Sequence, residues 1–458
     1  MNKPVPLTPL RSQQAVVIGG SIAGLLAARI LSNHFGNVTI VERDQFTNDA
    51  EPRKGAPQAR HAHAVLARAV GIIEDLFPGF FDELEASGAV KVDMCQDLGF
   101  FHFGKWKKRF SGGIYSYFQT RTFLEWKLRQ RVAAIPGITF RDGASVMQYT
   151  LDEKGTHITG VQLQSRDGSS QTSENLPAAL VVDASGRGSR TPQWLEALGY
   201  PRVEEMSLEV NIAYSTRVFH RGTSNLGKWK SLFIYPKLPD KRLGVILPTE
   251  DPTLWLVTLG GVFGDHPPTD DAGFLEFARS LPIPNLYDAI KDLEPAGPVL
   301  VHKLPSNLRR RYEHMARFPE GLVVLGDALC SFNPIYGQGM TTAALDALAL
   351  DDCLSEQVAA QPDGNLTGLA MKFQKRAATV IANPWLMATA EDMRYAEFSS
   401  PVPVHIRFLH WFTGRVHTIS DEDELASFRF TQVMNMVKSP WILFDPRLVW
   451  RAMMGPSS

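Results

Sequence analysis

A short glycine-rich segment near the start of the chain has the spacing of a phosphate-binding turn. Gly19-Gly20-Ser21-Ile22-Ala23-Gly24 follows the apolar run 15–18 and opens a helical pattern. Gly19 permits a tight turn, Gly24 allows the helix to pack close to the strand, and Ser21 takes the place of the usual middle glycine. Because the free N–H groups at a helix start favour anions, the segment predicts a pyrophosphate site.

An acidic residue follows at the distance expected for the other half of such a site. Glu42 ends a second apolar strand pattern, about twenty residues beyond the turn, where a carboxylate can accept hydrogen bonds from ribose hydroxyls. The alternative is an ordinary βαβ unit with a glycine-rich turn. The order strand, turn, helix, strand and acid favours a dinucleotide site over that alternative.

Two further acids end buried strand patterns later in the chain. Asp183 follows the apolar run 179–182, and Asp327 follows the run 321–326. Open α/β sheets bind ligands at the carboxyl ends of their strands, so we expect these acids near the glycine turn. Helix capping is the alternative for both, since each precedes a turn.

Arg60, His61 and His63 crowd the entry to a helix predicted over 62–76. A His-x-His pair can bind metal, but no third ligand stands at suitable spacing, so no metal site is predicted. Arg60 and His61 could be solvated loop charge with a capping histidine. The alternative is that both line a cofactor or substrate cavity.

Length and composition exclude several classes of protein. The chain has 458 residues and a formal net charge of −1, whereas nucleic-acid-binding proteins usually carry a basic excess. The three cysteines suggest neither a disulfide framework nor a zinc ribbon. No secretory signal and no run of eighteen apolar residues is seen, so we predict a cytoplasmic protein.

The patterns divide the chain into successive regions. Residues 1–14 are expected to be a flexible lead-in, and 15–200 form the first part of a nucleotide-binding domain that includes an aromatic, substrate-facing segment at about 93–118. Period-two alternation predicts a β-rich substrate domain over 201–310. Residues 311–355 complete the nucleotide-binding domain. The helical region 356–458 is expected to form a lid, with a peripheral membrane contact as the alternative.

Taken together, the three strand-end motifs resemble the p-hydroxybenzoate hydroxylase class of single-component FAD-dependent monooxygenases. The resemblance covers residues 14–355 and includes both order and spacing. The segments 326–340 and 60–63 look closest to a bacterial branch of polyether epoxidases, which are similar to squalene epoxidase. The implied fold is α/β, with a Rossmann-like FAD-binding domain of three-layer ββα type, an inserted β-sheet substrate domain and a helical C-terminal tail.

The resemblance also implies roles for individual residues. The glycine turn and Glu42 would hold the ADP half of FAD, Asp327 the ribityl chain, and the stretch 337–340 would run beneath the isoalloxazine. Asp183 and Arg187 match a fingerprint tied to FAD and NAD(P)H, although Ala184 replaces its usual glycine. The implied cofactor-binding set is Gly19, Ser21, Ala23, Gly24, Glu42, Arg43, Arg121, Val146, Asp183, Arg187, Gly326, Asp327, Pro334, Gly337, Gly339 and Met340. The catalytic candidates are Arg60, His61, Gly337 and Gln338.

The implied reaction transfers one oxygen atom from O2 to a hydrophobic small molecule, by hydroxylation or epoxidation, through a flavin C4a-hydroperoxide. A role in secondary metabolism is expected. Such chemistry needs a dry cavity, with which the aromatic content of 93–118 and 208–260 is compatible. Only one nucleotide fingerprint is present, so NAD(P)H would visit transiently or a separate flavin reductase would supply electrons.

Three other functions share parts of this pattern. One is a flavin-dependent reductase or dehydrogenase of the geranylgeranyl-reductase type, and another is a non-catalytic flavin-binding redox sensor. Flavin-dependent halogenation is the third, but the Trp-x-Trp-x-Ile-Pro signature of tryptophan halogenases is missing.

Overall fold

The first sheet of the protein is parallel and carries all three sequence motifs at one edge. A computed structural model describes residues 9–165, 173–398 and 400–454. The five strands lie in the order β17-β11-β1-β2-β7 and all neighbours are parallel. Their bounds are β1 Gln14–Ile18, β2 Asn37–Val41, β7 Ile138–Arg141, β11 Leu180–Asp183 and β17 Leu322–Val324. The strands β1, β2, β11 and β17 are mainly apolar and almost wholly buried, as expected for a sheet covered on both faces, whereas the edge strand β7 is partly exposed.

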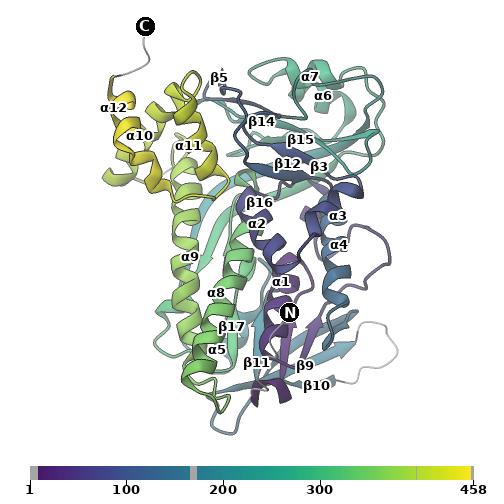
Figure 1. Ribbon diagram of the computed structural model, residues 1–458, viewed down its shortest axis with the longest axis vertical. Coiled ribbons are helices and arrows are strands. Elements are labelled where there is room, and N and C mark those ends of the chain that lie inside the picture. Colours follow the sequence, from purple (N-terminus) through teal and green to yellow (C-terminus); the bar gives the residue numbers. More distant parts are fainter. Residues whose placement is uncertain (1–8, 166–172, 399, 455–458) are drawn as a thin grey trace.

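Helices and a second sheet complete the layers around this parallel sheet. The helices α1, Ile22–His34, and α8, Gly339–Ala360, pack together, and α1 contacts β1, β2 and β11 (Figure 1). The antiparallel strands β8, Ala144–Leu151, β9, Ile158–Ser165, and β10, Ser173–Pro177, contact β2 and β11. This is the three-layer ββα arrangement of an FAD-binding domain, so the predicted fold class is confirmed.

A larger sheet lies across the carboxyl edge of the parallel sheet. Its eight strands follow the order β18-β16-β12-β15-β14-β13-β4-β5, and β13 and β4 are its parallel neighbours. The bounds are β4 Leu98–His102, β5 Lys105–Trp106, β12 Glu205–His220, β13 Ser231–Ile234, β14 Arg242–Pro248, β15 Leu254–Gly261, β16 Leu300–Arg310 and β18 Cys330–Ser331. The helices α6, Asp271–Arg279, and α7, Asn285–Ile290, cover its outer face (Figure 1).

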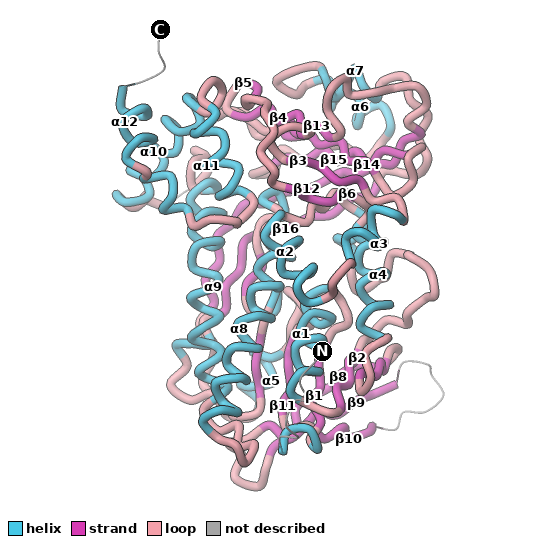
Figure 2. The backbone as a smooth tube through the Cα atoms, viewed as in Figure 1, coloured by secondary structure: helices cyan, strands magenta, loops and turns pink. Residues whose placement is uncertain are grey.

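The C-terminal helices form a separate layer beside the large sheet. The long α9, Leu369–Asp392, runs along α8 and leads into a cluster of shorter helices (Figure 2). These are α10 Val404–Ile419, α11 Glu424–Met434 and α12 Pro446–Met454. Among the described helices none is long and apolar enough to cross a membrane.

Short elements connect these layers. They are α2 Ala67–Leu76, α3 Phe80–Ala86, α4 Arg121–Ala133, α5 Thr191–Ala197 and the hairpin-like pair of β3, Val90–Asp93, with β6, Tyr115–Phe118. The helix α4 begins at Arg121 because the Thr120 side chain accepts a hydrogen bond from the backbone N–H of Phe123.

Four local expectations differ from the structure. Residues 9–12 form a 3-10 turn in which Leu10 is buried, so the expected flexible lead-in does not extend over 9–14. The helix expected from residue 62 begins at Ala67, because Val65 bridges Tyr117 in an extended conformation. The sequence of 144–146 predicts a short strand returning to the first sheet, but this segment joins β9. Pro384 is expected to break a helix, but it lies inside α9. A hairpin turn expected from Asp-Gly at 167–168 lies outside the described residues.

Candidate FAD and substrate site

One large cavity connects the glycine turn to the large sheet and the C-terminal helices. Its volume is about 1,100 Å³. At one end it is bounded by Gly19, Ser21 and Glu42, and in the middle by Asp327 and the start of α8. The other end lies under the large sheet and reaches side chains of α9, α10 and α11. The cavity is therefore long enough to bring all the sequence motifs and a distant apolar compartment into one site.

The glycine turn is as compact as its sequence predicts. Gly19 has φ +103°, and a Cβ placed there would lie 2.5 Å from the carbonyl oxygen of Ala184. A Cβ on Gly24 would lie 1.8 Å from the carbonyl oxygen of Gly19. Both positions therefore require glycine, and their packing brings the start of α1 against the ends of β1 and β11.

Two buried arginines surround this turn, together with carboxylates that hold them. Arg121 Nη2 donates to Ser21 Oγ at 3.0 Å, and Ser21 Oγ donates to Glu125 Oε2 at 2.5 Å. Arg53 is paired with Glu125 and, at 3.1 Å, with Glu42. Burial alone would raise the pKa of Glu125, but Arg121 and Arg53 outweigh burial and lower it. The Glu125 carboxylate is thus kept ionised between two cations.

Glu42 closes the turn as well as facing the cavity. Its carboxylate accepts from the Gly20 N–H at 2.9 Å and from the Asp44 N–H at 3.1 Å. The side chain lines the cavity with Arg43, which is mostly exposed. The sequence placed Glu42 correctly at the strand end, but it gave no signal for Arg53 and Glu125, which lie in a loop and a helix with no recognisable motif.

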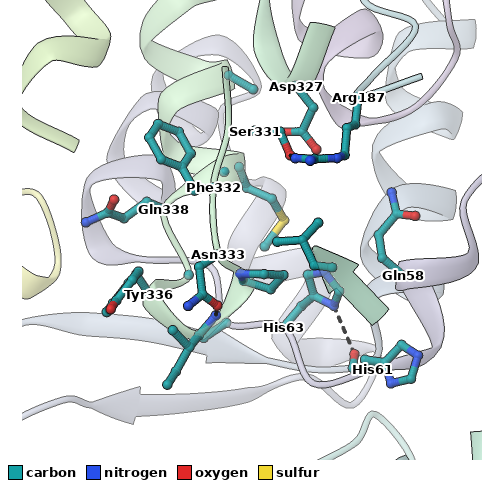
Figure 3. A pocket seen from close by; sticks show the side chains of 18 of the residues that line it. Gln58, His61, His63, Arg187, Asp327, Ser331, Phe332, Asn333, Tyr336 and Gln338 are labelled. Carbon is teal, nitrogen blue, oxygen red and sulfur yellow. Dashed lines mark hydrogen bonds between the residues drawn. The ribbon is translucent and has the colours of Figure 1, made fainter. Parts of the chain in front are cut away.

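Asp327 projects into the middle of the cavity. Among the described residues none hydrogen-bonds to its carboxylate. Burial raises its pKa above the ordinary value, while Arg121 and Arg187 oppose that effect. Figure 3 shows the Asp327 and Arg187 side chains directed toward the same part of the cavity, beside Ser331. A carboxylate in this position is free to accept hydrogen bonds from a ligand.

The turn that carries Asp327 is held by a hydrogen bond to a buried carboxyl group of α8. Gly326 packs against Ala23, and its backbone N–H donates to Asp346 Oδ2 at 3.0 Å. Asp346 belongs to α8 and is fully buried. Burial raises its pKa to about 7, with a further contribution from Asp327. Nothing in the sequence pattern distinguished Asp346 from the other polar residues of this helix.

Asp183 has a different place from the one expected. Its carboxylate accepts from the backbone N–H of Ser185 at 2.9 Å and from the hydroxyls of Ser185, Ser189 and Thr191. Asp183 is 1% exposed and does not line the cavity. We therefore correct its assignment: Asp183 caps the turn, and its neighbour Arg187 reaches the cavity. Arg187 donates to the hydroxyls of Ser331 and Ser306 at 3.2 and 3.0 Å.

Of the two catalytic candidates in the 60–63 segment, His61 faces the cavity and Arg60 faces the solvent. His61 is buried against the cavity, with Nδ1 2.8 Å from Thr216 Oγ1, and it faces His302 at a ring-centroid distance of 5.6 Å. Burial, assisted by His302, lowers the pKa of His61 to about 3. His63 donates from Nδ1 to the His61 carbonyl oxygen (Figure 3). Arg60 is exposed and does not line the cavity, because it ends the short 3-10 turn 57–60 on its outer side.

The loop before α8 is tied to the C-terminal helices by a buried carboxyl group. Asp392 of α9 accepts from Asn307 Nδ2 at 2.6 Å, Asn333 Nδ2 at 3.2 Å and Tyr336 Oη at 2.7 Å. Tyr214 in turn donates to Asn333 Oδ1 at 3.0 Å. Burial raises the pKa of Asp392 to about 7. The C-terminal region thus fixes the loop that ends at Gly337, a connection that no local pattern could predict.

Most of the residues proposed from the sequence meet in this cavity. Those that line it are Gly19, Ser21, Ala23, Glu42, Arg43, His61, Arg121, Val146, Arg187, Asp327, Pro334, Gly337, Gln338, Gly339 and Met340. Gly24 and Gly326 support the turns from behind, as close packing requires. Arg60 and Asp183 do not line the cavity.

The arrangement fits an FAD molecule. The glycine turn and Arg121, whose buried Nε has no partner among the described residues, would hold the anionic pyrophosphate. The unpartnered Asp327 would accept hydroxyl hydrogen bonds, and the start of the 22-residue α8 would face negative charge on the flavin ring. No other described cavity brings together this set of groups.

Comparison with known proteins agrees with this arrangement. Residues 12–368 match the FAD binding domain family. A protein of Mycobacterium tuberculosis, Rv3254, is 33% identical over 404 residues, which are 85% of this chain and 82% of that protein.

Two solved structures have a similar fold. PqsL of Pseudomonas aeruginosa, described as a probable FAD-dependent monooxygenase, has a TM-score of 0.60 and 18% identity, covering 84% of this chain and 98% of PqsL. The flavin-dependent brominase Bmp2 has a TM-score of 0.66 and 14% identity, covering 96% of this chain and 98% of Bmp2. At these identities the structures show the fold alone. The epoxidase-like branch stays a prediction. From its family match and its long relative, the chain belongs to the FAD binding domain family, with FAD as its cofactor, and its sequence resembles the FAD-dependent monooxygenases.

Proposed function

We propose that the protein transfers one oxygen atom from O2 to a hydrophobic small molecule, by hydroxylation or epoxidation, in secondary metabolism. The observation that carries this proposal is the continuity of the cavity. It runs from the FAD-binding turn past Asp327 and the start of α8 into an apolar compartment under the large sheet. A substrate held there would lie in the same enclosed space as the reactive ring of the cofactor.

Residues of this chain would bind and orient the cofactor and shield the cavity from water. When bound, FAD supplies the activation of O2, which no protein side chain provides. The glycine turn and Arg121 would orient the cofactor, and the start of α8 would favour negative charge near Gly337 and Gly339. His61 and His302, whose pKa values burial lowers, stay neutral and add no charge that would draw water into the cavity. Water exclusion matters because it prevents unproductive loss of activated oxygen.

Electrons would come from NAD(P)H in a transient visit or from a separate flavin reductase. This proposal is supported by the single dinucleotide-type glycine turn of the described parallel sheet. FAD would occupy that turn, which leaves no second turn of this type there for a resident NAD(P)H. The C-terminal helices would act as a lid, because Arg394, His417 and Phe430 from this region line the cavity. The alternative role of this region is a peripheral membrane contact, for which it offers the exposed side chains Phe408, Trp411 and Trp441.

Loss of Asp327 tests the cofactor site. Asp327→Ala removes an unshared acceptor, and a hydrogen bond to a charged group contributes roughly 1.5–3 kcal/mol. We expect FAD affinity to fall about 10- to 100-fold, so that the protein purifies largely colourless. Asp327→Asn, which keeps one acceptor oxygen, should retain more flavin. Full flavin content in Asp327→Ala would refute the site.

Oxygen chemistry tests the reaction. The reduced holoenzyme should react rapidly with O2, and ¹⁸O₂ should label the product formed from extracts of the producing cells. Turnover that is insensitive to O2 would instead identify a reductase. A flavin that is reduced and reoxidised with no labelled product from any extract would identify a redox sensor.

A further inference from the structure

The far end of the cavity contains two histidines that nothing above explains. This compartment is lined by residues of β4 in the large sheet and of the helices α10 and α11, which lie near one another in Figure 2. Phe100, Tyr235 and Phe430 contribute aromatic walls. His102, the last residue of β4, and His417, in the last turn of α10, meet there with ring centroids 4.8 Å apart and ring planes at 80°.

Aromatic side chains pack around the two imidazoles. His417 stacks on Phe103 at 4.0 Å and meets Phe430 edge-on at 4.5 Å, while His102 stacks on Phe100 at 5.2 Å. His417 is 4% exposed. Within the described chain the Nδ1 atom of each ring is buried without a hydrogen-bond partner. Buried polar groups in native proteins are nearly always paired, so each ring has an unmet hydrogen bond, and both residues line the cavity.

The surrounding charges keep both rings neutral. Burial holds the pKa values of His102 and His417 well below the ordinary value, the nearby cations Lys107 and Arg394 lower both further, and His102 also lowers that of His417. The cations themselves are balanced, since Lys107 donates to Asp421 at 2.6 Å and Arg394 donates to a neighbouring glutamate. A charged ligand therefore has no free counter-ion in this group, which favours a neutral one.

A neutral imidazole offers one N–H donor and one acceptor nitrogen. A hydroxyl group can accept a hydrogen bond from one ring and donate its own proton to the other through a single oxygen atom. The aromatic walls favour a flat, apolar body beside that hydroxyl, because offset and edge-on ring contacts add to the burial of apolar surface.

We propose that His102 and His417 form a subsite that recognises the hydroxyl group of a planar aromatic substrate. This inference rests on the proposed function, in that the ligand is taken to be the substrate. The subsite joins the large sheet to the C-terminal helices, so it would orient the substrate and close the compartment in one step. His417 and His102 are specificity-determining residues in this proposal.

Binding to the oxidised holoenzyme, without any electron donor, tests the subsite. Equilibrium dialysis would compare 2-naphthol, 2-methoxynaphthalene and naphthalene. We expect 2-naphthol to bind roughly tenfold more tightly than naphthalene, the equivalent of one hydrogen bond, with the methoxy compound between them because it accepts but cannot donate.

Matched variants assign that preference to the histidines. His102→Phe and His417→Phe should each abolish most of the preference for 2-naphthol while naphthalene affinity stays within about twofold, since the aromatic wall is kept. His405→Phe, the same change at an exposed position of α10, should leave the preference intact. Equal or undetectable binding of 2-naphthol and naphthalene by the wild type, or a preference that survives both substitutions together, would overturn the inference. If the preference is present but no oxygen is transferred, the proposed function fails and the subsite stands.

Discussion

Replacement of Asp346 by asparagine tests the electrostatics beneath the Gly326-Asp327 turn. One carboxyl oxygen of Asp346 accepts the Gly326 N–H at 3.0 Å, and the other is buried without a partner among the described residues. The asparagine carbonyl can accept the same hydrogen bond, and the side chain has nearly the same shape. The substitution therefore removes the ionisable group while it keeps the contact.

The sign and size of the effect follow from the pKa of Asp346, which burial raises from 3.8 to about 7. The folded protein binds this proton more tightly than the unfolded chain, so the residue's contribution to stability is complete below pH 3.8 and is lost as the pH rises through 7. Proton linkage with these values lowers the free energy of unfolding by about 2.5 kcal/mol between pH 5 and pH 8. Asp346→Asn avoids that loss.

Urea denaturation in excess FAD at pH 5 and pH 8 measures the effect. The free energy of unfolding of Asp346→Asn, relative to wild type, should increase by about 2.5 kcal/mol from the lower to the higher pH. Asp352→Asn, at an exposed position of the same helix, should show no such change. A relative stability that is the same at both pH values, or that moves in favour of the wild type at pH 8, would refute the reasoning.

Two further substitutions test the turn and its supporting charges. Gly24→Ala places a Cβ 1.8 Å from the Gly19 carbonyl oxygen, so α1 must shift and the purified protein should lose most of its FAD absorbance. The control Gly71→Ala, in open space on α2, should keep that absorbance. Full FAD absorbance in both variants would contradict the close packing at Gly24. Arg53→Met leaves the buried Glu42 without its cation and Glu125 with Arg121 alone, and should lower the free energy of unfolding in urea by roughly 3–5 kcal/mol. Arg43→Met, at an exposed position, should change it little, and equal effects of the two would show that the buried ion pairs contribute no special stability.

Much of the cofactor site was predictable because its requirements are local. A tight turn with φ +103° and a helix packed on the turn each demand glycine at a fixed spacing, so Gly19 and Gly24 are visible in the sequence. An acid at a strand end is visible for the same reason. The sequence does not show which partners that acid has in the fold. Asp327 faces the cavity, whereas Asp183 accepts hydrogen bonds from hydroxyl groups of its own turn.

The rest of the site depends on contacts between distant segments. Arg60 and His61 are neighbours in the chain, yet the path of one short turn buries His61 and exposes Arg60. The pairing of Asp392 with Asn333 joins α9 to the loop before α8, across 59 residues. No period or spacing encodes such a partner, because side-chain pairing over that separation depends on how whole layers pack.

The sequence by itself determined the cofactor class, the layered α/β fold and the edge of the sheet that carries the three motifs, since backbone geometry and strand-end position act over a few residues. Tertiary structure alone decided which polar groups remain free to meet a ligand. Asp327, His102 and His417 line the cavity, and in the part of the chain that the structure describes the Asp327 carboxylate and the two histidine Nδ1 atoms have no hydrogen-bond partner, whereas Asp183 and Glu125 are held by theirs. The physical reason is that a buried polar group is satisfied or left open by its neighbours in space, and those neighbours come from all parts of the chain.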